Sequence, residues 1–176
     1  MRPTAGQRTV VLCSHAGRGS NASVSRQFCA MTTDPGTYAL ILRSRSKATT
    51  RVGRWGQINL EKGYYIYVGS AFGPGGVRAR VSHHCRKNKS AHWHIDYLRR
   101  YLNPVGAWYS HDRKRLEHSW AQFLSDMSGI SSIQGFGCSD CKCNSHLFFT
   151  SKKPSLALFS NVIGGEIKSW SYGHAG

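Results

Sequence analysis

The sequence is poor in acidic residues and has no long apolar run. Only 8 of its 176 residues are Asp or Glu, against 24 Lys and Arg, which gives a formal net charge of +16. No uninterrupted apolar segment approaches the roughly 20 residues that a membrane-spanning helix needs, so the sequence predicts a soluble protein. No secretory hydrophobic segment precedes the six cysteines either, which favours an intracellular, reducing compartment.

Nucleic acid is the first partner that this charge predicts, because a strongly basic surface attracts polyanions. Most of the excess charge falls within residues 34–150, where 17 basic residues stand against 7 acidic ones. Acidic proteins and anionic lipid are alternatives on charge alone, but DNA is the expected partner and no membrane contact is expected. The expected compartment is the DNA-containing cytoplasm or nucleoid, or an organelle if residues 1–30 are a transit peptide.

The chain is predicted to hold one folded domain, since its length suits one core and no internal repeat is evident. Residues 1–33 are rich in Ser, Gly and Arg and lack acidic residues, which predicts a disordered basic extension. An alternative explanation is that the start codon was assigned too early and that translation naturally begins at Met31. The domain is expected over residues 34–163, followed by a tail over residues 164–176.

The pattern of strands and helices is that of an α+β fold. Segments rich in aromatic and β-branched residues predict a small antiparallel meander and one further strand. These strands are expected at residues 37–43, 51–60, 64–69 and 105–110. Segments with an apolar period near 3.6 residues predict helices at 77–86, 92–102 and 113–127. Pro104 is expected to end the second helix.

A glycine-rich turn at residues 73–76 separates the strand that carries Tyr67 from the helix that carries Arg80 and His84. Residues four apart share one helix face, so Arg80 and His84 are predicted to point the same way. An arginine can hold a phosphate with its planar fork of donors, and a histidine or tyrosine can move protons near neutral pH. The turn lacks the Lys-Ser/Thr ending of a P-loop, which argues against nucleotide hydrolysis.

Glu117 is expected at the edge of an apolar helix stripe, an informative place for one of only eight acidic residues. Mg²⁺ prefers oxygen ligands and often takes one or two carboxylates together with water and substrate phosphate. A structural alternative is an i,i+4 pair between Arg113 and Glu117. The corresponding alternative for Arg80 and His84 is simple exposure on a solvated helix face.

The motif order resembles that of the GIY-YIG endonuclease superfamily: "GTY" at 36–38, "YVG" at 67–69, then Arg80, His84 and Glu117. Residues 35–150, with "GPGG", "HWHIDYL" and "GFGCSDC", resemble its Uri-type branch, a domain found alone or attached to endonuclease III-like repair glycosylases. The resemblance implies a small, roughly three-stranded antiparallel sheet flanked by helices. It also implies metal-dependent cleavage of DNA, a context in DNA repair and repair proteins as partners.

The same resemblance assigns roles to five predicted catalytic residues. Tyr38 would orient or deprotonate the attacking water, and Tyr67 would line the same site. Arg80 would bind the scissile phosphate, His84 would assist proton transfer, and Glu117 would hold Mg²⁺ or Mn²⁺. A nucleic-acid-binding module without catalysis and a zinc-stabilised interaction domain are the alternative functions.

Three cysteines and a histidine crowd into nine positions, as Cys138, Cys141, Cys143 and His146. Structural Zn²⁺ takes Cys and His ligands in a tetrahedron, so these four residues are candidate zinc ligands. The favoured alternative is a glycine-rich loop with reduced thiols, in which Asp140 and His146 orient groups of the active site.

Basic runs predict the surface that follows the DNA backbone. The candidate DNA contacts are Arg86, Lys87, Lys89, His92, Arg99 and Arg100. Nothing in the sequence predicts contacts to base edges, so recognition of DNA structure rather than base sequence is expected.

Overall fold

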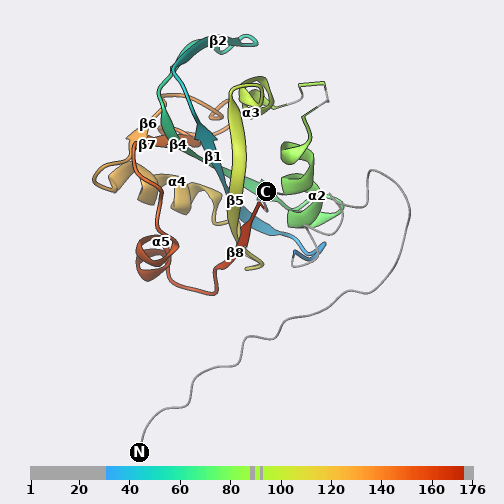
Figure 1. Ribbon diagram of the computed structural model, residues 1–176. Helices are drawn as coiled ribbons and strands as arrows, with labels where there is room; N and C mark the ends of the chain where they lie inside the picture. The colour runs from blue at the N-terminus through green and yellow to red at the C-terminus, as the bar shows by residue number, and fades with distance from the viewer. Residues whose placement is uncertain (1–30, 88–89, 92, 173–176) are drawn as a thin grey trace, which may run out of the picture.

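The computed structural model describes residues 31–87, 90–91 and 93–172, and its centre is a long antiparallel hairpin (Figure 1). Strand β1 (Gly36–Ser44) pairs with β4 (Gly63–Ala71) along nine residue pairs. Both strands are almost wholly buried, as their aliphatic and aromatic runs predict. The pairing sets Leu40 opposite Tyr67, so the Tyr38 and Tyr67 side chains are diagonal neighbours on one face of the sheet.

Two short strands extend this hairpin beyond the sheet. Strands β2 (Ala48–Val52) and β3 (Gly56–Leu60) pair with each other as a separate two-stranded sheet, which projects as an arm in Figure 1. The arm occupies residues 48–60 of the 28 residues, 39–66, that separate the "GTY" and "YVG" motifs. Its buried apolar residues, Val52, Ile58 and Leu60, belong to the core that includes Tyr38.

The main sheet has six strands, so the expectation of about three was wrong. Its order is β6-β7-β4-β1-β5-β8, and all its pairings are antiparallel. Besides β1 and β4 it contains β5 (Leu102–Ser110), which includes the strand predicted at 105–110. The strands that were not predicted are β6 (Ser131–Ser132), β7 (Leu147–Thr150) and β8 (Lys168–Ser171). Strand β8 lies in the segment predicted as a tail, where it pairs with β5 and buries Trp170.

Helices cover both faces of the sheet (Figure 1). On one face, α2 (Gly76–Cys85) and α3 (His94–Leu98) pack on the core that contains Tyr38, Leu40 and Leu42. On the other face, α4 (Glu117–Asp126) and α5 (Leu156–Ile163) pack on Ala39 and Ile41. This division follows from the alternation of side chains along β1. No helix within the described residues is long and apolar enough to cross a membrane.

Two helix boundaries differ from expectation. The predicted helix at 92–102 is only five residues long, and Pro104 lies within β5. Pro104 pairs with Leu42 where the β1–β5 register shifts, a place in a sheet that tolerates proline. The predicted helix at 113–127 begins only at Glu117, because the preceding Leu116 donates its backbone N–H to the Thr37 hydroxyl.

The N-terminal boundary of the folded domain also differs slightly. Met31 is 1% exposed within the core, although residues 1–33 were predicted as a disordered extension. The carbonyls of Thr32 and Asp34 accept hydrogen bonds from Arg78 and Val77 at the start of α2. Residues 31–33 therefore belong to the fold, whereas residues 1–30 lie outside the described part of the chain.

Candidate active site

A polar cavity of about 570 Å³ opens where β1, β4, α2 and α4 approach the loop that follows β6. Four of the five predicted catalytic residues line it: Tyr38, Tyr67, Arg80 and Glu117. The fifth, His84, is fully buried and does not line the cavity, so any part it takes in catalysis has to pass through a neighbouring group. Residues that are far apart in the sequence thus share one space large enough for a phosphate group.

A glycine makes room for the first phenol. Gly69 pairs with Tyr38 across the hairpin, and a Cβ atom at position 69 would lie 2.4 Å from the Tyr38 hydroxyl. The Tyr67 ring lies 6.5 Å from the Tyr38 ring, centroid to centroid. The glycine of "YVG" is therefore required by the close approach of the phenol rather than by an unusual backbone angle.

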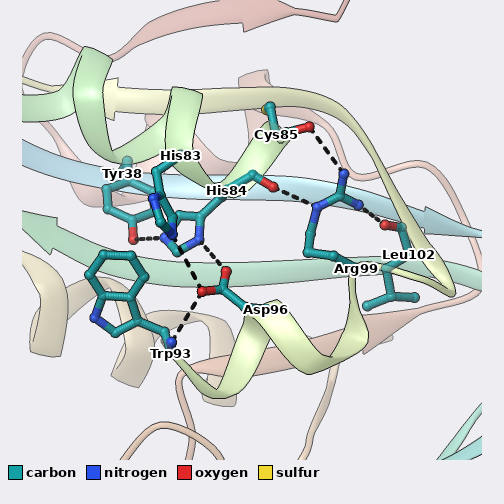
Figure 2. A network of polar contacts seen from close by, with 8 residues as sticks. All are labelled: Tyr38, His83, His84, Cys85, Trp93, Asp96, Arg99 and Leu102. Atoms are coloured by element: carbon teal, nitrogen blue, oxygen red, sulfur yellow. Dashed lines mark hydrogen bonds and ion pairs between the residues drawn. The ribbon is translucent and has the colours of Figure 1, made fainter. Parts of the chain in front are cut away.

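Tyr38 begins a chain of buried polar contacts (Figure 2). Its hydroxyl lies 2.9 Å from Nε2 of His84, and Nδ1 of His84 lies 3.1 Å from the Asp96 carboxylate. An ionised Asp96 can only accept, so Nδ1 carries the proton and Nε2 accepts from the Tyr38 hydroxyl. Asp96 also accepts from the backbone N–H of Trp93, which holds the carboxylate at the start of α3. Asp96 was not predicted from the sequence, where its only signal is that it is a rare acidic residue inside "HWHIDYL".

Burial keeps both phenols neutral. Burial raises the pKa of Tyr38 well above the ordinary value of 10.0, and the nearby Tyr67 raises it further. Burial likewise raises the pKa of Tyr67, and the charge of Glu117 adds to the effect. Tyr38 can therefore release its proton only to a partner that accepts it in the same step, and His84 is the group in place to do so.

Two guanidinium groups face the cavity, each resting on an aromatic ring. The Arg80 guanidinium lies 4.3 Å from the ring centroid of Trp93, and that of Arg115 lies 4.8 Å from the ring centroid of Phe72. Arg115 also lies 3.4 Å from the Ser70 hydroxyl. Arg115 was not among the site residues predicted from the sequence. Such stacking orients the planar donors of an arginine toward an anion.

Two carboxylates complete the polar lining. Glu117 is the first residue of α4, and Asp140 lies in the loop opposite. Burial raises the pKa of Glu117, and the charge of Asp140 raises it further, whereas His118 and Arg115 lower it. This donor set fits a hard divalent cation such as Mg²⁺ or Mn²⁺, which takes carboxylate oxygens and water. Nδ1 of His146 lies 3.3 Å from Oε1 of Glu117, and the contact with Arg113 that the alternative interpretation held is not formed. Burial lowers the pKa of His146, which favours a neutral imidazole beside the carboxylate.

The cysteine cluster differs from the predicted zinc site by one residue. The mutually close side chains are His118, Cys141, Cys143 and His146, whose ligand atoms all lie within 4.8 Å of one another. Cys138 does not belong to this group, and its thiol donates to the Phe136 carbonyl. Burial and neighbouring thiols raise the pKa of Cys138 to about 12. His118 takes its place because α4 brings a residue 23 positions before Cys141 beside the loop.

The predicted DNA contacts have mixed outcomes. Arg86, Lys87 and Arg100 are exposed, and the last two border a second cavity of about 490 Å³. The prediction for Arg99 was wrong, because its side chain is 5% exposed and its guanidinium donates to the carbonyls of His84, Cys85 and Leu102 (Figure 2). Lys89 and His92 lie outside the described residues.

The sequence matches one protein-family model over most of its length. A family model described as "Domain of unknown function DUF123" matches residues 37–166, about three quarters of the chain. The match spans β1 to α5 and therefore includes every residue assigned above to the cavity. No curated protein and no solved structure gave a significant match.

Proposed function

The chain belongs to the DUF123 family, and from that premise we propose that it is a metal-dependent endonuclease that hydrolyses phosphodiester bonds in DNA. We also propose that the GIY-YIG relationship, and the Uri-type branch within it, apply to this chain. The observation that carries the proposal is the shared cavity of Tyr38, Tyr67, Arg80 and Glu117. In this cavity Tyr38 can take a proton from water, the Arg80 guanidinium can bind a phosphate, and Glu117 supplies a carboxylate.

Proton transfer begins at the Tyr38 hydroxyl. As an attacking water gives a proton to the Tyr38 oxygen, the phenolic proton passes to Nε2 of His84 over 2.9 Å. The imidazolium that forms is stabilised by Asp96, 3.1 Å from Nδ1. The phenol returns to its neutral form, which agrees with its raised pKa. The water is left as a hydroxide that can attack phosphorus, and Asp96 and His84 act as positioning residues for Tyr38.

Charge on the phosphate is matched by groups across the cavity. Arg80, held against Trp93, can donate to the non-bridging oxygens, where negative charge grows in the transition state. Arg115 reaches the same cavity and supplies a second set of donors. Glu117 and Asp140 are the residues that would hold Mg²⁺ or Mn²⁺. Such an ion, when bound, neutralises charge on the phosphate and the leaving oxygen.

A panel of labelled DNAs tests the proposed activity. The full chain is incubated with duplex, single-stranded, flap, branched and damaged DNA, in Mg²⁺, in Mn²⁺ and in EDTA. The cavity is lined by groups that can bind phosphate and a metal ion, and nothing in the sequence predicts contacts to base edges. We therefore expect cleavage that depends on DNA structure and on the added cation. Tight binding to all forms without cleavage of any would instead favour a nucleic-acid-binding module, a function that the net charge of +16 alone would support.

A further inference from the structure

The cysteine loop has a ligand set for a second metal, separate from the one expected at Glu117. We propose that His118, Cys141, Cys143 and His146 bind one Zn²⁺, and that His146 transmits the position of this ion to Glu117 in the active-site cavity. The zinc site itself does not depend on the proposed endonuclease activity; only its influence on Glu117 does.

The four side chains already bring their ligand atoms close enough together to reach one ion. Nδ1 of His118 lies 3.1 Å from Sγ of Cys143, and Nε2 of His146 lies 3.3 Å from Sγ of Cys141. Zinc bonds of about 2.0–2.3 Å set tetrahedral ligand atoms roughly 3.3–3.8 Å apart. All four atoms lie within 4.8 Å of one another, so small side-chain rotations suffice. Two thiolates and two imidazoles are the set that selects zinc among the common divalent ions.

The loop backbone holds two of the ligands in place. Three hydrogen bonds close the segment 133–147: Ile133 to Leu147, Gly135 to Asn144 and His146 to Phe136, each donated by the first-named N–H. Cys141 and Cys143 stand near the tip of this closed loop. Gly137, with a φ of +76°, lets the backbone pass His146, whose side chain is 2% exposed. A loop built in this way presents ligands before a metal arrives, which lowers the ordering cost of binding.

The second nitrogen of His146 makes the connection to the cavity. Its Nδ1 is buried and lies 3.3 Å from Oε1 of Glu117, without the alignment of a full hydrogen bond. A metal-bound histidine ordinarily donates its other N–H to a carboxylate, which fixes both groups. With Nε2 bound to zinc, Nδ1 must carry the proton and donate to Glu117. The buried nitrogen and the cavity carboxylate are thereby satisfied together.

One loop thus serves both sites. Its residues Gly137, Ser139 and Asp140 line the active-site cavity, while its residues Cys141 and Cys143 are two of the four proposed zinc ligands. Zinc would join this loop to the first turn of α4, where Glu117 and His118 are consecutive. Removal of the ion is expected to loosen one wall of the cavity together with its principal carboxylate.

Metal analysis of the full-length protein tests the site directly. We expect about one zinc per chain after purification without chelator, and on replacement by Co²⁺ the intense visible bands of a tetrahedral site with thiolate charge transfer. His118→Ala changes an exposed side chain and should leave the fold intact. We expect it, like Cys141→Ser, to lower zinc affinity by more than about 10-fold.

Cys138→Ser is the matched control, because Cys138 is a neighbouring thiol outside the proposed set. It should keep both the zinc and the cobalt spectrum of the unchanged protein. Glu117→Gln should retain the ion with an affinity lowered about 10-fold or more, as expected for a group that orients a ligand. Absence of zinc with no thiolate–cobalt absorption would overturn the site, and so would loss of metal in Cys138→Ser with full retention in His118→Ala. None of these readouts requires DNA cleavage.

Discussion

At the scale of single residues, the proposed active site depends on buried polar groups whose partners come from distant parts of the chain. Tyr38, His84 and Asp96 belong to β1, α2 and α3, yet they form one continuous line of contacts. Each member is almost fully buried, so the loss of one side chain removes a polar contact from its neighbours in a medium of low dielectric. Single substitutions here should separate positioning from folding.

Asp96→Asn should impair catalysis without impairing DNA binding. The amide still accepts from the Trp93 N–H but can present an N–H to His84, which favours the tautomer that cannot accept the Tyr38 proton. By analogy with other histidine-orienting carboxylates, kcat should fall about 10²–10⁴-fold. The measurement is single-turnover cleavage, with Asp126→Asn as the exposed control. A fall in Tm that parallels the loss of rate would assign Asp96 a structural part only.

Arg99→Ala should destabilise the protein, whereas Arg100→Ala should not. Arg99 is buried and donates to three backbone carbonyls, so its truncation removes these hydrogen bonds and the packing of its side chain, at a cost of about 3 kcal/mol. Its neighbour Arg100 is exposed and serves as the matched control. Urea denaturation followed by tryptophan fluorescence gives both free energies of unfolding. Equal stabilities for the two variants would contradict the structural role.

At the scale of elements, the site is assembled where strand ends meet helix starts. The β1–β4 register sets the two tyrosines on one face, the turn at residues 73–76 starts α2 beside them, and α4 begins at Glu117. The turn requires glycine at position 76, where φ is +54° and a Cβ would lie 2.1 Å from the Asp34 carbonyl. These local constraints explain why the motif order alone was informative.

Trp170→Ala should show that β8 is part of the fold and not of a tail. Trp170 is 6% exposed in the core that includes Ala107 and Tyr109, so its truncation should lower the free energy of unfolding by about 3 kcal/mol or more. Thermal and urea unfolding measure the change, and Ser169→Ala, in the same strand, provides the control. If Trp170→Ala unfolds like the unchanged protein, the edge strand contributes nothing to stability.

Sequence reasoning succeeded where the signal was local. Buried runs identified β1 and β4, and the family-like motif order brought Tyr38, Tyr67, Arg80 and Glu117 to one site. It failed where position depends on tertiary packing. Asp96 and His118 gain their neighbours only after helices dock, and the four residues of β8 are too few for a period to be recognised. Arg99 resembled its exposed neighbour Arg100, because burial of one of two adjacent arginines has no signature in composition.

At the scale of the whole molecule, a six-stranded sheet separates two cores and leaves a polar cavity beside one end of the central hairpin. The formal net charge of +16 would attract a polyanion such as DNA. The ionisation of the buried tyrosines tests the integrity of the whole fold.

Four of the eight tyrosines should ionise at a higher pH in the folded protein than in the unfolded chain. The pKa values of Tyr38, Tyr65, Tyr67 and Tyr109 are raised, chiefly by burial. In the unfolded chain these phenols lose protons near pH 10, so the unfolded state holds fewer protons than the native state above that pH. Stability should therefore fall as pH rises above about 10. Tyrosinate absorbance should show a late cooperative step that coincides with loss of circular dichroism; gradual ionisation of all eight before unfolding would contradict the burial.

The most direct measurement is metal-dependent DNA cleavage by Glu117→Gln beside Glu166→Gln, a change at an exposed glutamate that does not line the cavity. Zinc content, fold and DNA binding are checked in each preparation. The account predicts that Glu117→Gln loses cleavage by more than about 100-fold while it still binds DNA, and that Glu166→Gln cleaves like the unchanged protein. Equal cation-dependent cleavage by all three proteins would contradict the assignment of the cavity as the active site.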